Sequence, residues 1–443
     1  MATIALVLGG AASCVRARRP NVILVTLDTT RADRLGCYGG PVPTPALDRL
    51  AAEGVVFETA VTPLPSTPQA HASILTGLLP PHHGLLRVGQ TLPAATPTLA
   101  TILAANGYSR AAAVAAAILD PRFGLNRGFA EYLAPDHADA LAADVQVGRA
   151  QEIVARARGP FFLWLHLYDP HRPYLPPDAY RDRFRDDPAS ARYGRDADAF
   201  RRETTDPVAE GRAPTPDELR LAMALYDGEV RFMDAELDAL WDFLRARGLW
   251  DGALIVVTAD HGESFRADYP FDHTDRLTEE IVRVPLIVKL PGARARARVR
   301  APVDLTDILP TVLDVAGIPA PAGIDGRSLR PLWEGSLTKV RDGCFSEAPR
   351  TGNPRSVGSW VSWRDERFKL IHNLDRAEGA LYPIAGTAVD ERRDVCEGHV
   401  DDCRRYIGRA LDLAERLGVG RRVAAPALDE ETWERLRRLG YVR

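Results

Sequence analysis

The chain has 443 residues, of which 46% are hydrophobic and 26% charged, a composition typical of folded globular proteins. Its formal net charge of −4 provides no basic field for a polyanion, so nucleic acid is not expected as a partner. The length predicts one large α/β domain with an appendage, or roughly two or three domains.

The first residues are small and apolar, and this run ends at Cys14. The stretch 11–14 loosely resembles a bacterial lipobox, in which the cysteine is lipidated after signal cleavage. No Lys or Arg precedes this short run, so a frayed terminus or a misassigned start codon accounts for it equally well. We therefore treat 1–19 as a candidate signal segment. A lipid anchor at Cys14 predicts a periplasmic or membrane-anchored lipoprotein, and without it the protein is expected in the cytoplasm.

Continuous β-branched and apolar runs predict strands buried on both faces of a parallel sheet. These runs are 22–27, 161–167, 254–258 and 284–288. Helical stretches lie between them, at 45–53, 98–106, 141–157 and 219–247. Strands alternating with helices predict the α/β fold class with an open, mostly parallel sheet.

Two later stretches break this pattern. The segment 182–216 is rich in Arg, Asp and Pro and has little periodicity, which predicts a surface excursion and a candidate lid over the site. The pattern changes again around 319–323, and strand-like runs at 359–362 and 368–372 indicate a smaller α+β appendage. We predict a catalytic α/β domain at 20–335 and a C-terminal subdomain at 336–443.

The sequence contains five cysteines: Cys14, Cys37, Cys344, Cys396 and Cys403. Cys396 and Cys403 are close enough in sequence to close a small disulfide loop, which would suit an oxidising compartment. No CxxC motif or Cys/His cluster occurs, so a zinc–thiolate site is not indicated.

Polar residues follow two of the predicted strands directly. Asp28 ends the run 22–27, and Asp260-His261 follows the run 254–258. Ligands of open α/β sheets bind beyond the carboxyl ends of the strands. Two carboxylates and an imidazole there can converge on one hard or borderline divalent cation. Taken singly, each has a simpler explanation, because Asp after a strand is often a helix cap and Asp-His-Gly is a common turn.

A hydroxyl residue stands before Pro68 at the start of a helix-like run. This places Thr67 or Ser66 at the N-cap, with Pro68 as the first helical residue. The hydroxyl is either an ordinary cap or a nucleophile. As a nucleophile it would be stabilised by the helix dipole and by a metal bound to the same oxygen.

Several blocks of sequence, in a fixed order, resemble the sulfatase family of the alkaline-phosphatase superfamily. The resemblance runs from about residue 20 to the end of the chain. The blocks are 20–33 with 36–39, 75–77 with 81–84 (Leu-Thr-Gly, then Pro-His-His-Gly), 96–100, 106–108, 169–174 (Asp-Pro-His-Arg-Pro-Tyr), 260–263 (Asp-His-Gly-Glu), 283–287, 304–317, 325–329 and 439–442.

The resemblance implies a doubly wound sheet with helices on both faces, and a small C-terminal antiparallel sheet. It also implies one divalent ion, often Ca²⁺, Mn²⁺ or Zn²⁺, with four ligands: Asp28, Thr67, Asp260 and His261. By the same resemblance, His171 would contact the anionic oxygens of the substrate or protonate the leaving group. His273 would lie near the leaving oxygen, and His71 occupies the place of an arginine that steadies the nucleophile.

Two positions depart from the family pattern. Thr29 replaces the second Asp of the first strand end, which removes one carboxylate ligand and leaves room for Mn²⁺ or Zn²⁺ beside Ca²⁺. Sulfatases of this family convert a Cys or Ser to formylglycine, whereas the nucleophile position here is Thr67, which cannot be converted. A shift of one residue would put Ser66 in that position instead.

The sequence therefore predicts a metal-dependent hydrolase of sulfate, phosphate or phosphonate esters, and Thr67 favours a phosphodiester or phosphonate ester. The substrate is expected to be a small-molecule, glycan or lipid ester. Two alternatives remain open: a sulfuric ester hydrolase with formylglycine derived from Ser66, and a non-catalytic member that binds a glycan or a partner.

Overall fold

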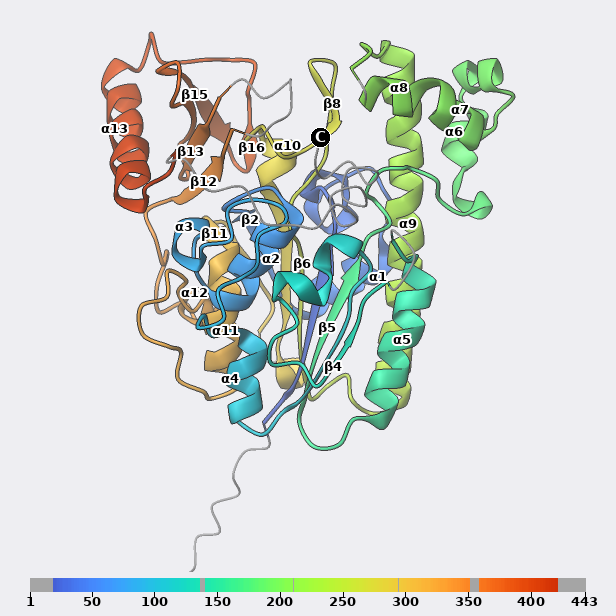
Figure 1. Ribbon diagram of the computed structural model, residues 1–443, viewed down its shortest axis with the longest axis vertical. Coiled ribbons are helices and arrows are strands. Elements are labelled where there is room, and N and C mark those ends of the chain that lie inside the picture. Colours follow the sequence, from blue (N-terminus) through green and yellow to red (C-terminus); the bar gives the residue numbers. More distant parts are fainter. Residues whose placement is uncertain (1–18, 136–139, 210, 294, 351–357, 421–443) are drawn as a thin grey trace, which may run out of the picture.

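The computed structural model describes residues 19–135, 140–209, 211–293, 295–350 and 358–420. Cys14 and the block 439–442 therefore lie outside the described residues. A nine-stranded sheet forms the centre of the fold, with helices on both faces (Figure 1). In spatial order its strands are β10 (Ala297–Val299), β2 (Val55–Val61), β9 (Arg283–Lys289), β6 (Ala253–Ala259), β1 (Asn21–Leu27), β5 (Phe161–Leu167), β3 (Ser109–Ala113) and β4 (Glu131–Leu133), with β11 (Val303–Asp304) also on β2.

The predicted mostly parallel sheet is confirmed, with one exception. The run 284–288 forms β9, which lies antiparallel to both β2 and β6. An apolar run indicates that a strand is buried on both faces, but its composition does not indicate whether the strand runs parallel or antiparallel to its neighbours. The other three apolar runs form β1, β5 and β6, which pair in parallel.

Two sets of helices cover the sheet. On one face α1 (Pro45–Glu53) and α5 (Ala143–Arg156) pack along α9 (Pro216–Ala246). On the other face lie α2 (Thr67–Thr76), α4 (Leu99–Ala105) and α11 (Ile308–Val315), with the single-turn helices α3 (Pro80–His83) and α12 (Arg330–Trp333) beside them (Figure 1). No helix in the described ranges is both long and apolar enough to cross a membrane.

The segment 182–216 is more ordered than its sequence suggests. It forms α6 (Asp182–Asp186), α7 (Ala197–Phe200) and α8 (Asp206–Ala209), beside the upper end of α9 in Figure 1. Phe184, Tyr193 and Phe200 are buried and pack on one another with ring centroids 5.0 to 5.5 Å apart. These three rings give the segment a small core of its own, which a periodicity search misses because its helices are so short.

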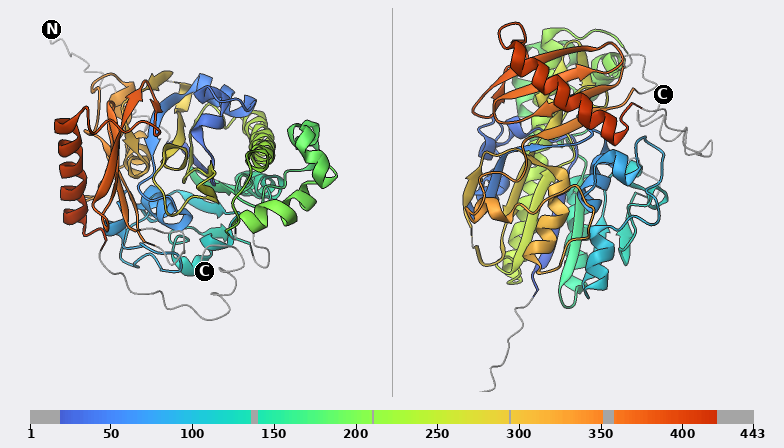
Figure 2. Two further views of the ribbon diagram at one scale, coloured as in Figure 1. Left: turned by 90° about the horizontal axis from the view of Figure 1, so that it is seen from above. Right: turned by 90° about the vertical axis from the view of Figure 1, so that its left-hand side faces the viewer.

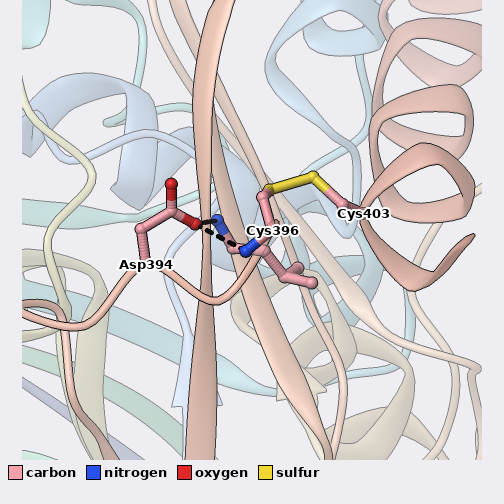
Figure 3. The surroundings of a disulfide bond; sticks show 4 residues. Asp394, Cys396 and Cys403 are labelled. Atoms are coloured by element: carbon pink, nitrogen blue, oxygen red, sulfur yellow. Dashed lines mark hydrogen bonds between the residues drawn. A yellow bond between two sulfur atoms is a disulfide. The ribbon is translucent and has the colours of Figure 1, made fainter. Parts of the chain in front are cut away.

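The C-terminal part forms a separate antiparallel sheet, as predicted. Its strands are β12 (Cys344–Ala348), β13 (Trp360–Arg364), β14 (Phe368–Asn373), β15 (Glu378–Ala385) and β16 (Ala388–Val389), with α13 (Val400–Leu417) packed on one face (Figures 1 and 2). The proposed limits of this subdomain, 336–443, stay a prediction. The expected disulfide between Cys396 and Cys403 is present and ties α13 to the segment after β16 (Figure 3). Next to it, Asp394 accepts hydrogen bonds from the amides of Leu381 and Cys396.

Two hydrogen bonds join the C-terminal sheet to backbone carbonyls of the segment that leads into α2. The amide of Glu347 on β12 donates to the carbonyl of Pro63 at 2.8 Å, and the hydroxyl of Ser346 donates to the carbonyl of Thr62 at 2.7 Å. The sheet therefore helps to fix the chain just before Ser66 and Thr67.

A buried ionic cluster attaches the same sheet to α10 (Glu279–Val282). The fully buried ammonium of Lys369 lies 3.1 Å from the carboxylate of Glu279 and 2.9 Å from that of Glu391. The guanidinium of Arg364 lies 3.3 Å from Glu279. Removing one partner from such a cluster leaves an uncompensated buried charge, which is strongly destabilising.

We expect Lys369→Ala to lower the free energy of unfolding by about 3 kcal/mol, because Glu279 and Glu391 would lose a buried cation. Urea denaturation of the metal-free chain measures this. The control is Lys339→Ala, which removes an exposed pair with Asp342 and should leave the free energy of unfolding essentially unchanged, because water screens that pair. Equal effects of the two substitutions would show that the cluster does not stabilise the fold.

Candidate active site

Two neighbouring strands carry the candidate metal ligands to the carboxyl edge of the sheet. Leu27 of β1 lies opposite Ala259 of β6 in a parallel pair, so the next residues, Asp28 and Asp260, leave the sheet side by side. Asp28, Asp260 and His261 are fully buried, and one ligand atom from each lies within 4.8 Å of the other two. The structure thus brings together three residues predicted as ligands, and we call them the ligand triad.

The carboxylates of the triad lack the donors that buried carboxylates need. Within the described residues, neither oxygen of Asp28 accepts a hydrogen bond, and Oδ2 of Asp260 accepts none. Oδ1 of Asp260 accepts from the amides of His261 at 2.8 Å and Thr29 at 3.3 Å. Burial, and next the charge of Asp260, raise the pKa of Asp28 well above its ordinary value. Unsatisfied carboxylates buried side by side are unfavourable without a cation, so this donor set fits a divalent metal ion.

The tautomer of His261 is fixed by its neighbour. Its Nδ1 lies 3.0 Å from the carbonyl oxygen of Gly262, which can only accept, so Nδ1 carries the proton and Nε2 the lone pair. Nε2 lies 3.3 Å from Oδ2 of Asp260. When Asp260 is ionised, two lone pairs face each other there, and a cation between them would remove the repulsion. Two carboxylates and one imidazole suit Mn²⁺ or Zn²⁺ and also accept Ca²⁺.

The turn that carries His261 is held from behind by α10. A side chain at Gly262 would place its Cβ 1.9 Å from the carbonyl oxygen of Glu280, so only glycine fits there. The amide of Gly262 donates to the carbonyl of Ile281 at 2.7 Å. The ionic cluster of Lys369 therefore supports the ligand turn through α10.

Of the two candidate nucleophiles, Thr67 has its hydroxyl beside the ligand triad. Its Oγ1 lies 3.3 Å from Nε2 of His261, and the residue is 1% exposed. Ser66 is the N-cap of α2, with an extended backbone and no side-chain capping bond, and Thr67 is the first helical residue. Pro68 therefore stands one position later in the helix than the sequence predicts. The hydroxyl of Thr67 lies at the positive end of α2.

His71 contacts the backbone of Thr67 one helical turn away. Its Nδ1–H donates to the carbonyl of Thr67 at 2.7 Å, and its Nε2 accepts from the hydroxyl of Thr26 at 2.9 Å. The hydroxyl of Thr26 in turn accepts from the indole N–H of Trp164 at 2.9 Å. Burial lowers the pKa of His71 to about 4, so the side chain is neutral. His71 thus contacts the backbone of Thr67 without a charge, and its role in steadying the nucleophile stays a prediction.

His166 is a site residue that the sequence analysis missed. It lies on β5, fully buried, with Nε2 3.3 Å from Oδ2 of Asp28 and Nδ1 accepting from the amide of Ala115 at 3.2 Å. Burial lowers the pKa of His166 to about 4. The available signal was one histidine inside the apolar run 161–167.

Two further histidines border the ligand triad. The ring of His273 stacks on that of His261 with centroids 4.1 Å apart, and the ring of His171 lies 5.5 Å from His273. The Nδ1–H of His171 donates to the carbonyl of Arg172 at 2.7 Å. Burial, and next the charge of His273, lower the pKa of His171 well below its ordinary value, so it is neutral. His273 therefore lies against the triad, and His171 lies beside His273.

A buried carboxylate keeps His273 charged. Oε1 of Glu263 lies 3.2 Å from Nδ1 of His273, and Oε2 accepts from the hydroxyl of Tyr174 at 3.1 Å. Although burial opposes the charge, Glu263 raises the pKa of His273 to about 9. The pairing depends on the hairpin of β7 (Ser264–Arg266) and β8 (Tyr269–Asp272), which folds His273 back onto Glu263. The motif Asp-His-Gly-Glu gave no separate reason to select Glu263.

The chain is similar to proteins of the sulfatase family. A family profile described as Sulfatase matches residues 20–318, and one described as N-sulphoglucosamine sulphohydrolase, C-terminal, matches residues 270–390. The multifunctional alkaline phosphatase superfamily protein PehA of Trinickia caryophylli is 28% identical over 448 residues, covering 80% of this chain and 87% of its own.

Solved structures share the fold at low identity. The phosphonate monoester hydrolase of Silicibacter pomeroyi is 24% identical with a TM-score of 0.70, covering 90% of this chain and 96% of its own. A protein solved in complex with its substrate D-glucosamine-2-N,6-O-disulfate is 20% identical with a TM-score of 0.74, covering 90% of this chain and 98% of its own. Because the sulfatase profile also spans more than half of the chain, the protein belongs to the sulfatase family and is a hydrolase.

Proposed function

We propose that the chain hydrolyses phosphodiesters or phosphonate monoesters, with Thr67 as the nucleophile. One observation carries this proposal. Thr67 begins α2, and its hydroxyl oxygen lies 3.3 Å from Nε2 of His261. The free amides and dipole of a helix N-terminus stabilise an ionised hydroxyl and an anionic ester. A divalent ion held by the ligand triad would lower the pKa of the hydroxyl and offset the negative charge of the ester.

The side chains around Thr67 supply the remaining roles. Attack of its oxygen on phosphorus forms one O–P bond and breaks the bond to the leaving alcohol. The adduct is a threonyl phosphodiester, which keeps the second ester group of the substrate, or a phosphonyl-threonine. Water then attacks phosphorus in line and restores the hydroxyl. His273, which Glu263 keeps protonated, is the proposed proton donor to the leaving oxygen. His171, next to it, is the proposed contact for the other ester oxygens.

The choice of phosphorus over sulfur follows from the nucleophile. A formylglycine hydrate can expel sulfate by reforming its carbonyl group, whereas a threonyl sulfate has no such exit. A phosphorus adduct on threonine needs none, because water can attack phosphorus directly. The similarity to PehA and to a phosphonate monoester hydrolase supports this choice.

For the alcohol portion of the substrate and for the metal, we propose classes rather than single compounds or ions. The alcohol portion is a small molecule, a glycan or a lipid, and the metal is Mn²⁺, Zn²⁺ or Ca²⁺. A lipid anchor at Cys14 would place the enzyme at a periplasmic membrane, and without the anchor it acts in the cytoplasm.

Thr67→Ala should lower turnover of an aryl phosphodiester and an aryl phosphonate monoester by at least about 1000-fold, because the covalent route is lost. Ser66→Ala is the matched control and should stay within about 3-fold of the parent. Both variants are assayed with Mn²⁺, Zn²⁺ or Ca²⁺, alongside an aryl sulfate.

The intact mass of the peptide containing Ser66 and Thr67 separates the outcomes. An unmodified peptide with phosphodiester or phosphonate turnover supports the proposal. Sulfate turnover with two hydrogens lost from Ser66 would identify a formylglycine sulfatase. Near-normal activity of Thr67→Ala would remove Thr67 from the mechanism, and no turnover with any ester would favour a binding protein.

Asp28→Asn and Asp260→Asn should each reduce bound metal from one ion per chain to well below 0.2, because each removes a charged ligand. Elemental analysis after dialysis against limiting Mn²⁺ measures this without any assay of turnover. Asp33→Asn is the control, since Asp33 pairs with Arg31 and is 47% exposed. Unchanged metal content in either triad variant would exclude that residue as a ligand.

A further inference from the structure

A histidine that the proposed chemistry does not use lies beneath the ligand triad. His166 stands opposite Thr26 of the neighbouring strand, and its ring meets that of His71 edge to face at 5.0 Å. The amide of Ala115 can only donate, so Nδ1 of His166 holds a lone pair and Nε2 holds the proton. This N–H lies 3.3 Å from Oδ2 of Asp28.

The same residues could instead be read as ligands of a second ion. Nitrogen and oxygen atoms of His71, His166 and Asp260 lie within 4.8 Å of one another, close enough to surround a cation. Hydrogen bonding argues against this reading. Both nitrogens of His71 are engaged, Nδ1–H by the carbonyl of Thr67 and Nε2 by the hydroxyl of Thr26. The one nitrogen of His166 that faces the site carries a proton, and a protonated nitrogen cannot bind a metal.

We propose that His166 is a positioning residue, which holds the carboxylate of Asp28 in the orientation that binds the ion of the ligand triad. This inference rests on the metal site of the proposed function. The carboxylate of Asp28 accepts no hydrogen bond within the described ranges, and Nε2 of His166 has no hydrogen-bond partner there either. The 3.3 Å contact falls outside hydrogen-bond geometry, so it acts as an attraction between a charge and an N–H dipole.

The polarity of this contact is set by the backbone. Because Ala115 lies just after β3 and its amide always donates, His166 cannot turn its lone pair toward the buried carboxylate without losing that bond. Partners behind a ligand of this kind typically contribute 10- to 100-fold to metal affinity. Because the contact between His166 and Asp28 lacks hydrogen-bond geometry, we expect the contribution of His166 to metal affinity to be near the lower end of that range.

Two substitutions separate positioning from simple packing. His166→Asn puts an amide oxygen near the place of Nδ1, so it keeps an acceptor for Ala115 and removes the donor to Asp28. His166→Gln puts an amide N–H near the place of Nε2, so it keeps the donor and removes the acceptor. A residue needed only for packing and for the bond to Ala115 would tolerate Asn better than Gln.

The measurement is the dissociation constant of Mn²⁺ for the metal-stripped full chain, by isothermal titration calorimetry, with elemental analysis for stoichiometry. The unfolding midpoint without metal is recorded for each variant. We expect one ion per chain, a dissociation constant about 10-fold higher for His166→Asn, and one within about 3-fold of the parent for His166→Gln.

Several results would overturn the inference. Unchanged affinity in His166→Asn, or weakening in both variants that follows their loss of stability, would leave His166 a packing residue. Two ions in the parent and one in His166→Asn would make it a ligand of a second site. The expected Mn²⁺ result in a chain without phosphoester turnover would keep the inference and reject the proposed function. A parent chain that binds no Mn²⁺, Zn²⁺ or Ca²⁺ would reject both.

Discussion

The arrangement of the site depends on one electrostatic constraint, the burial of Asp28 and Asp260 at adjacent strand ends. Parallel pairing of β1 and β6 forces the two carboxylates together, and among the residues that the structure describes, Oδ1 of Asp260 is the one carboxylate oxygen of the pair with donors in hydrogen-bond geometry. Like charges in such a setting repel and lose hydration, so the folded chain is incomplete without a cation. The pairing of β1 and β6 that brings the two carboxylates together also fixes the position at which a cation would offset their repulsion.

Hydrogen bonds to backbone atoms fix the tautomers of three buried histidines around the two carboxylates. A carbonyl sets the proton of His261 on Nδ1, a carbonyl does the same for His71, and an amide sets the proton of His166 on Nε2. Carbonyls and amides cannot exchange roles, so these tautomers are properties of the fold rather than of pH. Each ring therefore presents a defined atom: a lone pair toward Thr67 and the triad from His261, a donor to the backbone of Thr67 from His71, and a donor toward Asp28 from His166.

Much of this architecture could be predicted from the sequence, because short stretches of neighbouring residues determine it. Continuous apolar runs located β1, β5 and β6, and the polar residues that end them located Asp28, Asp260 and His261 at one edge. Long-range pairing escaped prediction. The antiparallel direction of β9 leaves no mark on its composition, His166 lies hidden inside an apolar run, and the contact of Glu263 with His273 depends on a hairpin. The catalytic roles, the metal and the domain limits stay predictions.

In the proposed function, the charge of the site and the chemistry of the nucleophile would each restrict the substrate. Asp28 and Asp260 would balance a divalent ion, while Glu263 balances the protonated His273, so these four side chains and the ion would together carry no net charge before Thr67 ionises. A neutral site of this kind suits monoanionic esters better than the dianion of a phosphate monoester. Sulfate esters, phosphodiesters and phosphonate monoesters all meet that condition. The proposed threonine nucleophile would then discriminate among them, because its adduct must be opened by attack of water, and this attack is available at phosphorus.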